Sequence, residues 1–188
     1  MTLSSLPNLI CILRIALAVP VVWALVHGHF GLTLALFAIA AVSDGLDGYL
    51  AKRFDWTSEA GKVLDPVADK LLLVSVFITL TLLGLVPLWL AVAVVLRDLV
   101  IGGGAAVYRW LFGPLEGHPT RPSKLNTVLQ LAYVLAVVGN AATPAIPSAL
   151  VVTLGAAVLV TTFVSGVDYV MIYIRKAVRV SQSRRLAA

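Results

Sequence analysis

The chain has 188 residues, of which 60% are hydrophobic and 12% are charged, and its mean hydropathy is +1.00. Ordinary soluble domains carry about 25% charged residues, so this composition excludes that class and predicts a membrane protein with a single domain, residues 1–188. The formal net charge of +5 indicates a basic cytoplasmic face that attracts anionic membrane lipids, and we expect no nucleic acid as a partner.

Apolar runs of about 20 residues, the length that crosses a bilayer, follow one another along the chain. The first contains Arg14 and has no basic segment before it, so we expect it to remain as a helix and not to be cleaved as a signal peptide. The sequence predicts an all-α fold, a polytopic membrane bundle of six transmembrane helices. These helices are expected at Asn8–His27, Leu32–Leu50, Leu64–Leu85, Leu88–Phe112, Leu125–Gly139 and Ile146–Ile174.

Lysine and arginine occur on alternate connections between these runs. The connections HGHFG, GLVP and GNAATPAIPS contain none, whereas the second connection, the fourth connection and a basic tail at about 175–188 contain several. Because basic residues stay in the cytoplasm, we expect both termini and the second connection there, in a bacterial-type inner (plasma) membrane. The tail is interpreted as a basic helix beside the membrane, either a solvated flank or a site for anionic lipid.

Acidic residues are concentrated in the second connection and its borders. Six of the nine in the chain lie there, namely Asp44, Asp47, Asp55, Glu59, Asp65 and Asp69. Asp44 and Asp47 are three residues apart at the end of one run, and Asp65 and Asp69 are four apart at the start of the next, so each pair shares a helix face. Four carboxylates brought to one point need cations between them, and hard oxygen ligands suit Mg²⁺, Mn²⁺ or Ca²⁺. This pattern predicts a two-metal site that acts on a phosphate or diphosphate.

The spacing of these residues is that of a known signature. The chain reads Asp44-x2-Asp47-Gly48-x2-Ala51-Lys52, then eight residues to Gly61, then x3-Asp65-x3-Asp69. This closely resembles the signature of the CDP-alcohol phosphatidyltransferase family, D-x2-D-G-x2-A-R-x8-G-x3-D-x3-D. Lys52 stands where the family has arginine, although Arg53 follows it. Solvated carboxylates at helix ends would explain the acidic residues but not Gly48, Ala51 and Gly61.

The resemblance implies a membrane enzyme that transfers a phosphatidyl group from CDP-diacylglycerol to an alcohol, a lipid or a polyol phosphate, and releases CMP. It assigns Asp44, Asp47 and Asp65 to two Mg²⁺ (or Mn²⁺) ions, with Asp69 as a further ligand or as the catalytic general base. The same three metal ligands, with Gly48, Ala51, Lys52 and Gly61, would bind the CDP group, although small residues at these positions also suit plain helix packing. The resemblance further implies a homodimer.

Basic residues outside the signature are candidates for binding the acceptor or its phosphate. These candidates are Arg14, Arg53, Arg97, Arg121 and Lys124. For Arg97 the alternative is mutual neutralisation with Asp98, and for Arg121 it is simple flanking of a span on the cytoplasmic side. Arg97-Asp98-Leu99 and Ser123-Lys124-Leu125-Asn126-Thr127, with Gln130 after it, look like cardiolipin synthases of this family.

Other classes of protein are compatible with some of these features. Phosphatidylglycerophosphate synthases share the resemblance, with glycerol 3-phosphate in place of phosphatidylglycerol as the acceptor. An Asp-rich membrane prenyltransferase would also hold a diphosphate on Mg²⁺, but its two separated Asp-rich loops are missing. A small cation transporter would place the aspartates near mid-bilayer, often with inverted repeats, whereas here they fall at one membrane face.

Overall fold

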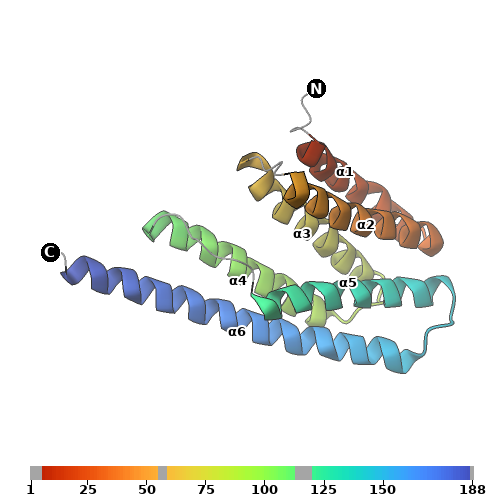
Figure 1. The fold of residues 1–188 in the computed structure, drawn as a ribbon. Coiled ribbons are helices and arrows are strands. Elements are labelled where there is room, and N and C mark those ends of the chain that lie inside the picture. Colours follow the sequence, from red (N-terminus) through yellow and green to blue (C-terminus); the bar gives the residue numbers. More distant parts are fainter. Residues whose placement is uncertain (1–5, 55–58, 113–119, 187–188) are drawn as a thin grey trace. The chain divides into compact units, whose positions relative to one another are not determined.

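The computed structural model describes residues 6–54, 59–112 and 120–186, with side chains described for 15–40, 42, 43, 70–111, 120–176 and 178. The described chain is helical and contains no strand, which confirms the all-α prediction (Figure 1). The helices are α1 (Leu6–Val26), α2 (Phe30–Phe54), α3 (Glu59–Leu82), α4 (Leu88–Phe112), α5 (Arg121–Ala142) and α6 (Ser148–Leu186).

Two of the predicted turns are closed by glycines in the left-handed conformation. After α1, Gly28 has a φ of 72°, and the next amide, that of His29, donates a hydrogen bond back to the Ala24 carbonyl at 2.8 Å. After α3, Gly84 has a φ of 73°, and the Leu85 amide donates to the Leu80 carbonyl at 2.9 Å. A side chain at either glycine would strain this backbone, so the two residues explain why the helices end there.

Helices α5 and α6 are longer than the apolar runs that predicted them. Helix α5 begins at Arg121 because Thr120 caps it: the Thr120 hydroxyl accepts a hydrogen bond from the Ser123 amide at 3.4 Å. Helix α6 has 39 residues, about 58 Å, and continues through the basic tail to Leu186. No glycine or proline interrupts the sequence after Gly166, so nothing local stops the helix at the end of the apolar run. The helical tail expected from the sequence is therefore present.

Three described segments are long and apolar enough to cross a membrane: Leu88–Leu111, Arg121–Ala142 and Ser148–Lys176. In the other three helices the described apolar segments are shorter, namely Ile15–Val26, Phe30–Ala40 and Lys70–Leu82. Large apolar side chains point outward on the long segments; Trp110 on α4 is 84% exposed and Val152 on α6 is 70% exposed. Such surfaces suit contact with lipid, and the chain is accordingly a helical membrane protein.

The chain divides into two compact units, and the first comprises residues 1–87 and 134–147. In it α1 packs against both α2 and α3. Buried apolar side chains from all three helices form its core, including Val21, Leu25, Phe37, Val76 and Phe77. Helix α1 therefore holds in place the two helices that carry the four aspartates of the signature.

The second unit comprises residues 88–133 and 148–188. Helix α4 packs against α6, and Figure 1 shows the two lying along one another. Leu90, Val94 and Val158 are buried here, but so are several polar side chains, namely Arg97, Asn126, Gln130, Thr162 and Ser165. An apolar helix bundle rarely buries so many polar groups without a function for them.

Candidate functional site

The four aspartates of the signature lie on two helices of the first unit. Asp44 and Asp47 belong to α2, and Asp65 and Asp69 belong to α3. The side chains from Asp44 to Asp69 fall outside the described residues, and so do those of Arg14 on α1, Lys52 and Arg53. The carboxylate cluster, its metal ions and the CDP contacts of Gly48, Ala51 and Gly61 therefore remain predictions, placed on helices that share α1 as a packing partner.

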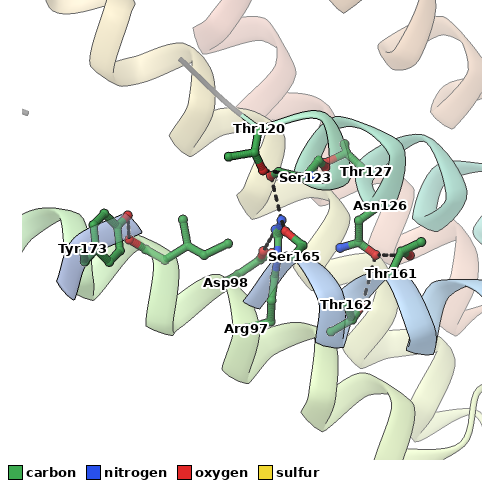
Figure 2. A network of polar contacts seen from close by, with 11 residues as sticks. Arg97, Asp98, Thr120, Ser123, Asn126, Thr127, Thr161, Thr162, Ser165 and Tyr173 are labelled. Atoms are coloured by element: carbon green, nitrogen blue, oxygen red, sulfur yellow. Dashed lines mark hydrogen bonds and ion pairs between the residues drawn. The ribbon is translucent and has the colours of Figure 1, made fainter. Parts of the chain in front are cut away.

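The described part of the second unit contains a polar cluster around Arg97 (Figure 2). The Arg97 guanidinium donates from Nη1 to the Asp98 carboxylate at 2.7 Å and from Nη2 to the Ser123 hydroxyl at 2.7 Å. Nη2 also donates to the Ser165 hydroxyl. One side chain of α4 thereby joins α5 and α6.

The Arg97–Asp98 ion pair is buried, with side-chain exposures of 5% and 11%. The mutual neutralisation that the sequence left open is thus observed. It does not use the whole guanidinium, because Nε is buried without a hydrogen-bond partner in the described structure. Removing one member of such a pair typically costs about 3–5 kcal/mol, so Arg97 has a structural role whatever else it binds.

A second set of polar contacts continues along the seam between α5 and α6. The Asn126 side-chain oxygen accepts hydrogen bonds from the Thr161 hydroxyl at 2.8 Å and from the Thr162 hydroxyl at 3.1 Å. The Asn126 nitrogen and both polar atoms of Gln130 are buried with no hydrogen-bond partner among the described residues. Each such atom costs about 1–3 kcal/mol if it stays unsatisfied.

The sequence interpretation missed these residues as site candidates. Asn126 and Gln130 entered it as parts of a motif, and Thr161, Thr162 and Ser165 were not considered. A signal existed for α5, because Ser123, Asn126 and Gln130 recur at helical spacing at the start of an apolar run. Sequence alone offered no means of matching that face to α6.

Arg121 and Lys124 lie in the first turn or just after it in α5, and both side chains are exposed. A helix N-terminus carries a partial positive charge, so two cations there do not stabilise the helix. Together with the helix dipole they make this end of α5 attractive to an anion. The geometry is therefore compatible with the predicted phosphate-binding role of these two residues and equally with cytoplasmic flanking.

A cavity of about 680 Å³ lies in the first unit beside the turn between α1 and α2. It is lined by Trp23, Gly28, His29, Phe30, Gly31, Leu32, Ala141, Ala142 and Thr143. Phe30 and Asp44 are separated by fourteen residues of α2, about 21 Å along the axis. This cavity therefore lies beside the first turn of α2, far from the aspartates, and is not the candidate catalytic centre.

Comparison with known proteins decides the family. A family model described as CDP-alcohol phosphatidyltransferase matches residues 4–176, which includes the whole aspartate signature. The chain belongs to the CDP-alcohol phosphatidyltransferase family. The resemblance that the signature indicated is thereby confirmed.

The chain is similar to proteins named cardiolipin synthase and to proteins named phosphatidylglycerophosphate synthase. The chain is 36% identical over 148 residues to a probable cardiolipin synthase (CMP-forming) of Drosophila melanogaster, covering 69% of this chain and 45% of the relative. It is 30% identical over 148 residues to the cardiolipin synthase (CMP-forming) of Homo sapiens, covering 70% and 49%. It is 33% identical over 175 residues to a probable phosphatidylglycerophosphate synthase of Mycobacterium tuberculosis, covering 89% and 81%. The chain thus spans less than half the length of these two cardiolipin synthases.

Proposed function

We propose that this chain is a membrane enzyme that transfers the phosphatidyl group of CDP-diacylglycerol to an alcohol and releases CMP. The observation that carries the proposal is the family match over residues 4–176, with seven signature positions at the family spacing on α2 and α3. The names of relatives from both synthase groups support the same reaction type. A prenyltransferase or a cation transporter would leave this match unexplained.

In this reaction Asp44, Asp47 and Asp65 would hold two Mg²⁺ or Mn²⁺ ions. Their carboxylate oxygens are the donors that such ions prefer. When bound, the ions neutralise the diphosphate and stabilise the departing CMP. Asp69 is the candidate base that accepts the proton of the acceptor hydroxyl as its oxygen attacks the lipid-side phosphorus, and Gly48, Ala51, Lys52 and Gly61 are the candidate CDP contacts. We expect direct attack, because the sequence offers no serine or cysteine constellation of the kind that forms a covalent intermediate.

Cardiolipin synthase, with phosphatidylglycerol as the acceptor, is the first candidate. The short motifs at Arg97-Asp98-Leu99 and Ser123–Thr127 and the names of several relatives support it. Phosphatidylglycerophosphate synthase, with glycerol 3-phosphate, is the second candidate, supported by the 81% coverage of the mycobacterial relative. In either case the candidate ligands of the acceptor or its phosphate are Arg14, Arg53, Arg97, Arg121 and Lys124. Among those whose side chains are described, the exposed Arg121 and Lys124 are the most accessible.

We further propose that all six helices span a bacterial-type inner (plasma) membrane, with both termini and the aspartates on the cytoplasmic side. The alternation of basic and uncharged connections supports this topology. A homodimer is the proposed assembly, since the family resemblance implies one. Exposed Gly102 on α4, where an added Cβ would meet nothing within 4 Å, leaves room for close helix packing.

The proposal is tested by measuring CMP release from CDP-diacylglycerol by the purified protein in lipid–detergent micelles with Mg²⁺. Phosphatidylglycerol and glycerol 3-phosphate are supplied in separate reactions. Release only with phosphatidylglycerol identifies a cardiolipin synthase, and release only with glycerol 3-phosphate identifies a phosphatidylglycerophosphate synthase. A protein that releases no CMP with any alcohol acceptor, including serine and inositol phosphate, would contradict the proposed reaction.

A further inference from the structure

Four buried polar atoms in the second unit lack a hydrogen-bond partner among the described residues. They are Arg97 Nε, Asn126 Nδ2, and Nε2 and Oε1 of Gln130. Asn126 and Gln130 are fully buried, with 0% exposure. Buried polar atoms without a hydrogen-bond partner are rare in native proteins. Four of them in one region indicate that a polar group from outside the chain binds there.

These atoms belong to one continuous seam. Ser123, Asn126 and Gln130 are spaced three and four residues apart, so they share a face of α5. Thr161, Thr162 and Ser165 share a face of α6 and contact that face of α5, through Asn126 or through Arg97. In Figure 2 the Asn126 amide lies between these contacts, with its nitrogen turned to the side of Arg97 and Ser165.

One end of the Asn126 amide lacks a hydrogen-bond partner whichever way the amide is turned. Two threonine hydroxyls point at its oxygen, and the Thr161 hydroxyl also lies 2.8 Å from the Ala157 carbonyl of its own helix. If the amide were turned round, its nitrogen would meet the threonine oxygens and its oxygen would be the atom left over. In both orientations one end of the amide has no partner, and both ends of Gln130 have none.

The chemistry of the seam favours hydroxyl groups over an anion. Its one cation, Arg97, is already paired with Asp98 at 2.7 Å, so a buried phosphate here would bring a charge without a counter-charge. Carboxamides present a donor and an acceptor side by side, and an alcohol hydroxyl uses both. The exposed cations Arg121 and Lys124 stand at the start of the same helix, so a phosphate would bind there.

Resting on the function proposed above, we propose that Asn126 and Gln130, with Arg97 Nε as a further donor, form a subsite for the glycerol hydroxyls of the acceptor. Both candidate acceptors carry a glycerol unit with two neighbouring free hydroxyls. Lys124 and Gln130 are six residues apart, about 9 Å along α5. The candidate phosphate site and the hydroxyl subsite therefore lie one after the other along the same helix. A site built to bond a hydroxyl also rejects the analogue that lacks it, so this seam selects glycerol acceptors.

The test compares acceptors with and without the neighbouring hydroxyl. Glycerol 3-phosphate is paired with 3-hydroxypropyl phosphate, and phosphatidylglycerol with phosphatidyl-1,3-propanediol. We expect the wild type to prefer the glycerol member of the productive pair at least tenfold in kcat/KM. In Gln130→Met and Asn126→Leu, the KM of the glycerol acceptor should rise at least tenfold and the preference should fall towards one, with the KM of CDP-diacylglycerol changed less than twofold.

Thr127→Val is the matched control, because Thr127 lies on α5 between these residues but is exposed and bonds to the Ser123 carbonyl of its own helix. It should leave the acceptor preference unchanged. Gln130→Met nearly preserves the side-chain volume and removes an unsatisfied amide, so the Tm of the ligand-free variant should be equal to or above that of the wild type. A variant with a lower Tm would show that the amide has a structural partner, which would overturn the subsite.

Ligand-induced changes in Tm separate this inference from the proposed function. If the wild type released no CMP, the reaction would be wrong, but glycerol 3-phosphate or phosphatidylglycerol should still raise the Tm of the wild type and not that of Gln130→Met. If CMP release were normal while both variants kept the wild-type acceptor KM and preference, the function would stand and the subsite would be refuted.

Discussion

At the scale of the residue, Arg97 shows how a charge is accommodated inside an apolar bundle. Its guanidinium is buried, yet Nη1 meets the Asp98 carboxylate and Nη2 meets two hydroxyls from other helices. The hydroxyl contacts matter because a buried ion pair stabilises a protein only when its remaining donors are also satisfied. Arg97 therefore connects α4, α5 and α6 within the second unit.

This role predicts a large loss of stability when Arg97 is removed alone. Arg97→Met deletes the charge beside Asp98 and the bonds to Ser123 and Ser165, and we expect a cost of about 3–5 kcal/mol. The double variant Arg97→Met/Asp98→Leu should recover part of that loss, because it leaves no buried carboxylate at this place. A thermal-unfolding double-mutant cycle in detergent measures this coupling, and additive losses would contradict it.

The aspartates are predicted to act through metal ions and not through the fold. Asp44→Ala and Asp65→Ala should each abolish CMP release, since two ions cannot be held without them, while the circular dichroism spectrum and elution volume stay those of the wild type. Removal of divalent cations with EDTA should abolish the activity of the wild type, and added Mg²⁺ should restore it. Glu59→Ala is the matched control, an acidic residue at a variable position of the signature, and it should keep most activity. An active, metal-insensitive Asp44→Ala protein would refute the assignment.

At the scale of the element, the contact of α4 with α6 depends on one small residue. A Cβ added to Gly104 would lie 2.5 Å from Cε2 and 2.7 Å from Cδ2 of Tyr173. The Tyr173 hydroxyl donates a hydrogen bond to the Ile101 carbonyl at 2.9 Å, which holds the ring against α4. At the adjacent Gly103 an added Cβ would meet nothing within 4 Å. The two glycines thus have different local environments despite their identical sequence chemistry.

Alanine substitutions at Gly104 and Gly103 should accordingly have different effects on the free energy of unfolding. Gly104→Ala forces the Tyr173 ring to move and should destabilise the protein by about 1–3 kcal/mol. Gly103→Ala should be neutral or stabilising by up to about 1 kcal/mol, because alanine is the better helix former. Combining Gly104→Ala with Tyr173→Leu should relieve the clash. Thermal unfolding in one detergent measures all three, and equal effects of the two alanines would argue against the α4–α6 contact.

Many of the helices and turns could be predicted from local sequence, whereas the polar cluster around Arg97 could not. The turns after α1 and α3 follow from Gly28 and Gly84, and the number of helices follows from the apolar runs. The start of α5 depends on the Thr120 cap, a polar contact that hydropathy ignores. The bond from Arg97 to Ser165 joins residues 68 positions apart, so no local pattern indicates it. The aspartate pairs were found because a signature records their spacing, whereas Thr161 and Thr162 look like ordinary span residues.

At the scale of the whole molecule, the distribution of charge is the strongest evidence on topology. Lysine and arginine are absent from three connections: α1 to α2, α3 to α4 and α5 to α6. The cavity of the first unit is lined by residues at the first and the last of these connections. The basic residues of the C-terminal helix and of the start of α5 belong to the other set. Because lysine and arginine are retained in the cytoplasm, these two sets should face opposite sides of the membrane.

Single-cysteine labelling tests this arrangement directly, since the native chain has one cysteine, Cys11. In a Cys11→Ser background, His29→Cys places a thiol at the exposed turn after α1, and Arg121→Cys places one at the exposed start of α5. A membrane-impermeant maleimide added to intact cells should label His29→Cys at once. Arg121→Cys should be labelled only after the membrane is permeabilised, because the proposed orientation places its thiol on the cytoplasmic side with the aspartates. The reverse pattern would place the aspartates outside the cell and would refute the proposed orientation while leaving the family membership intact.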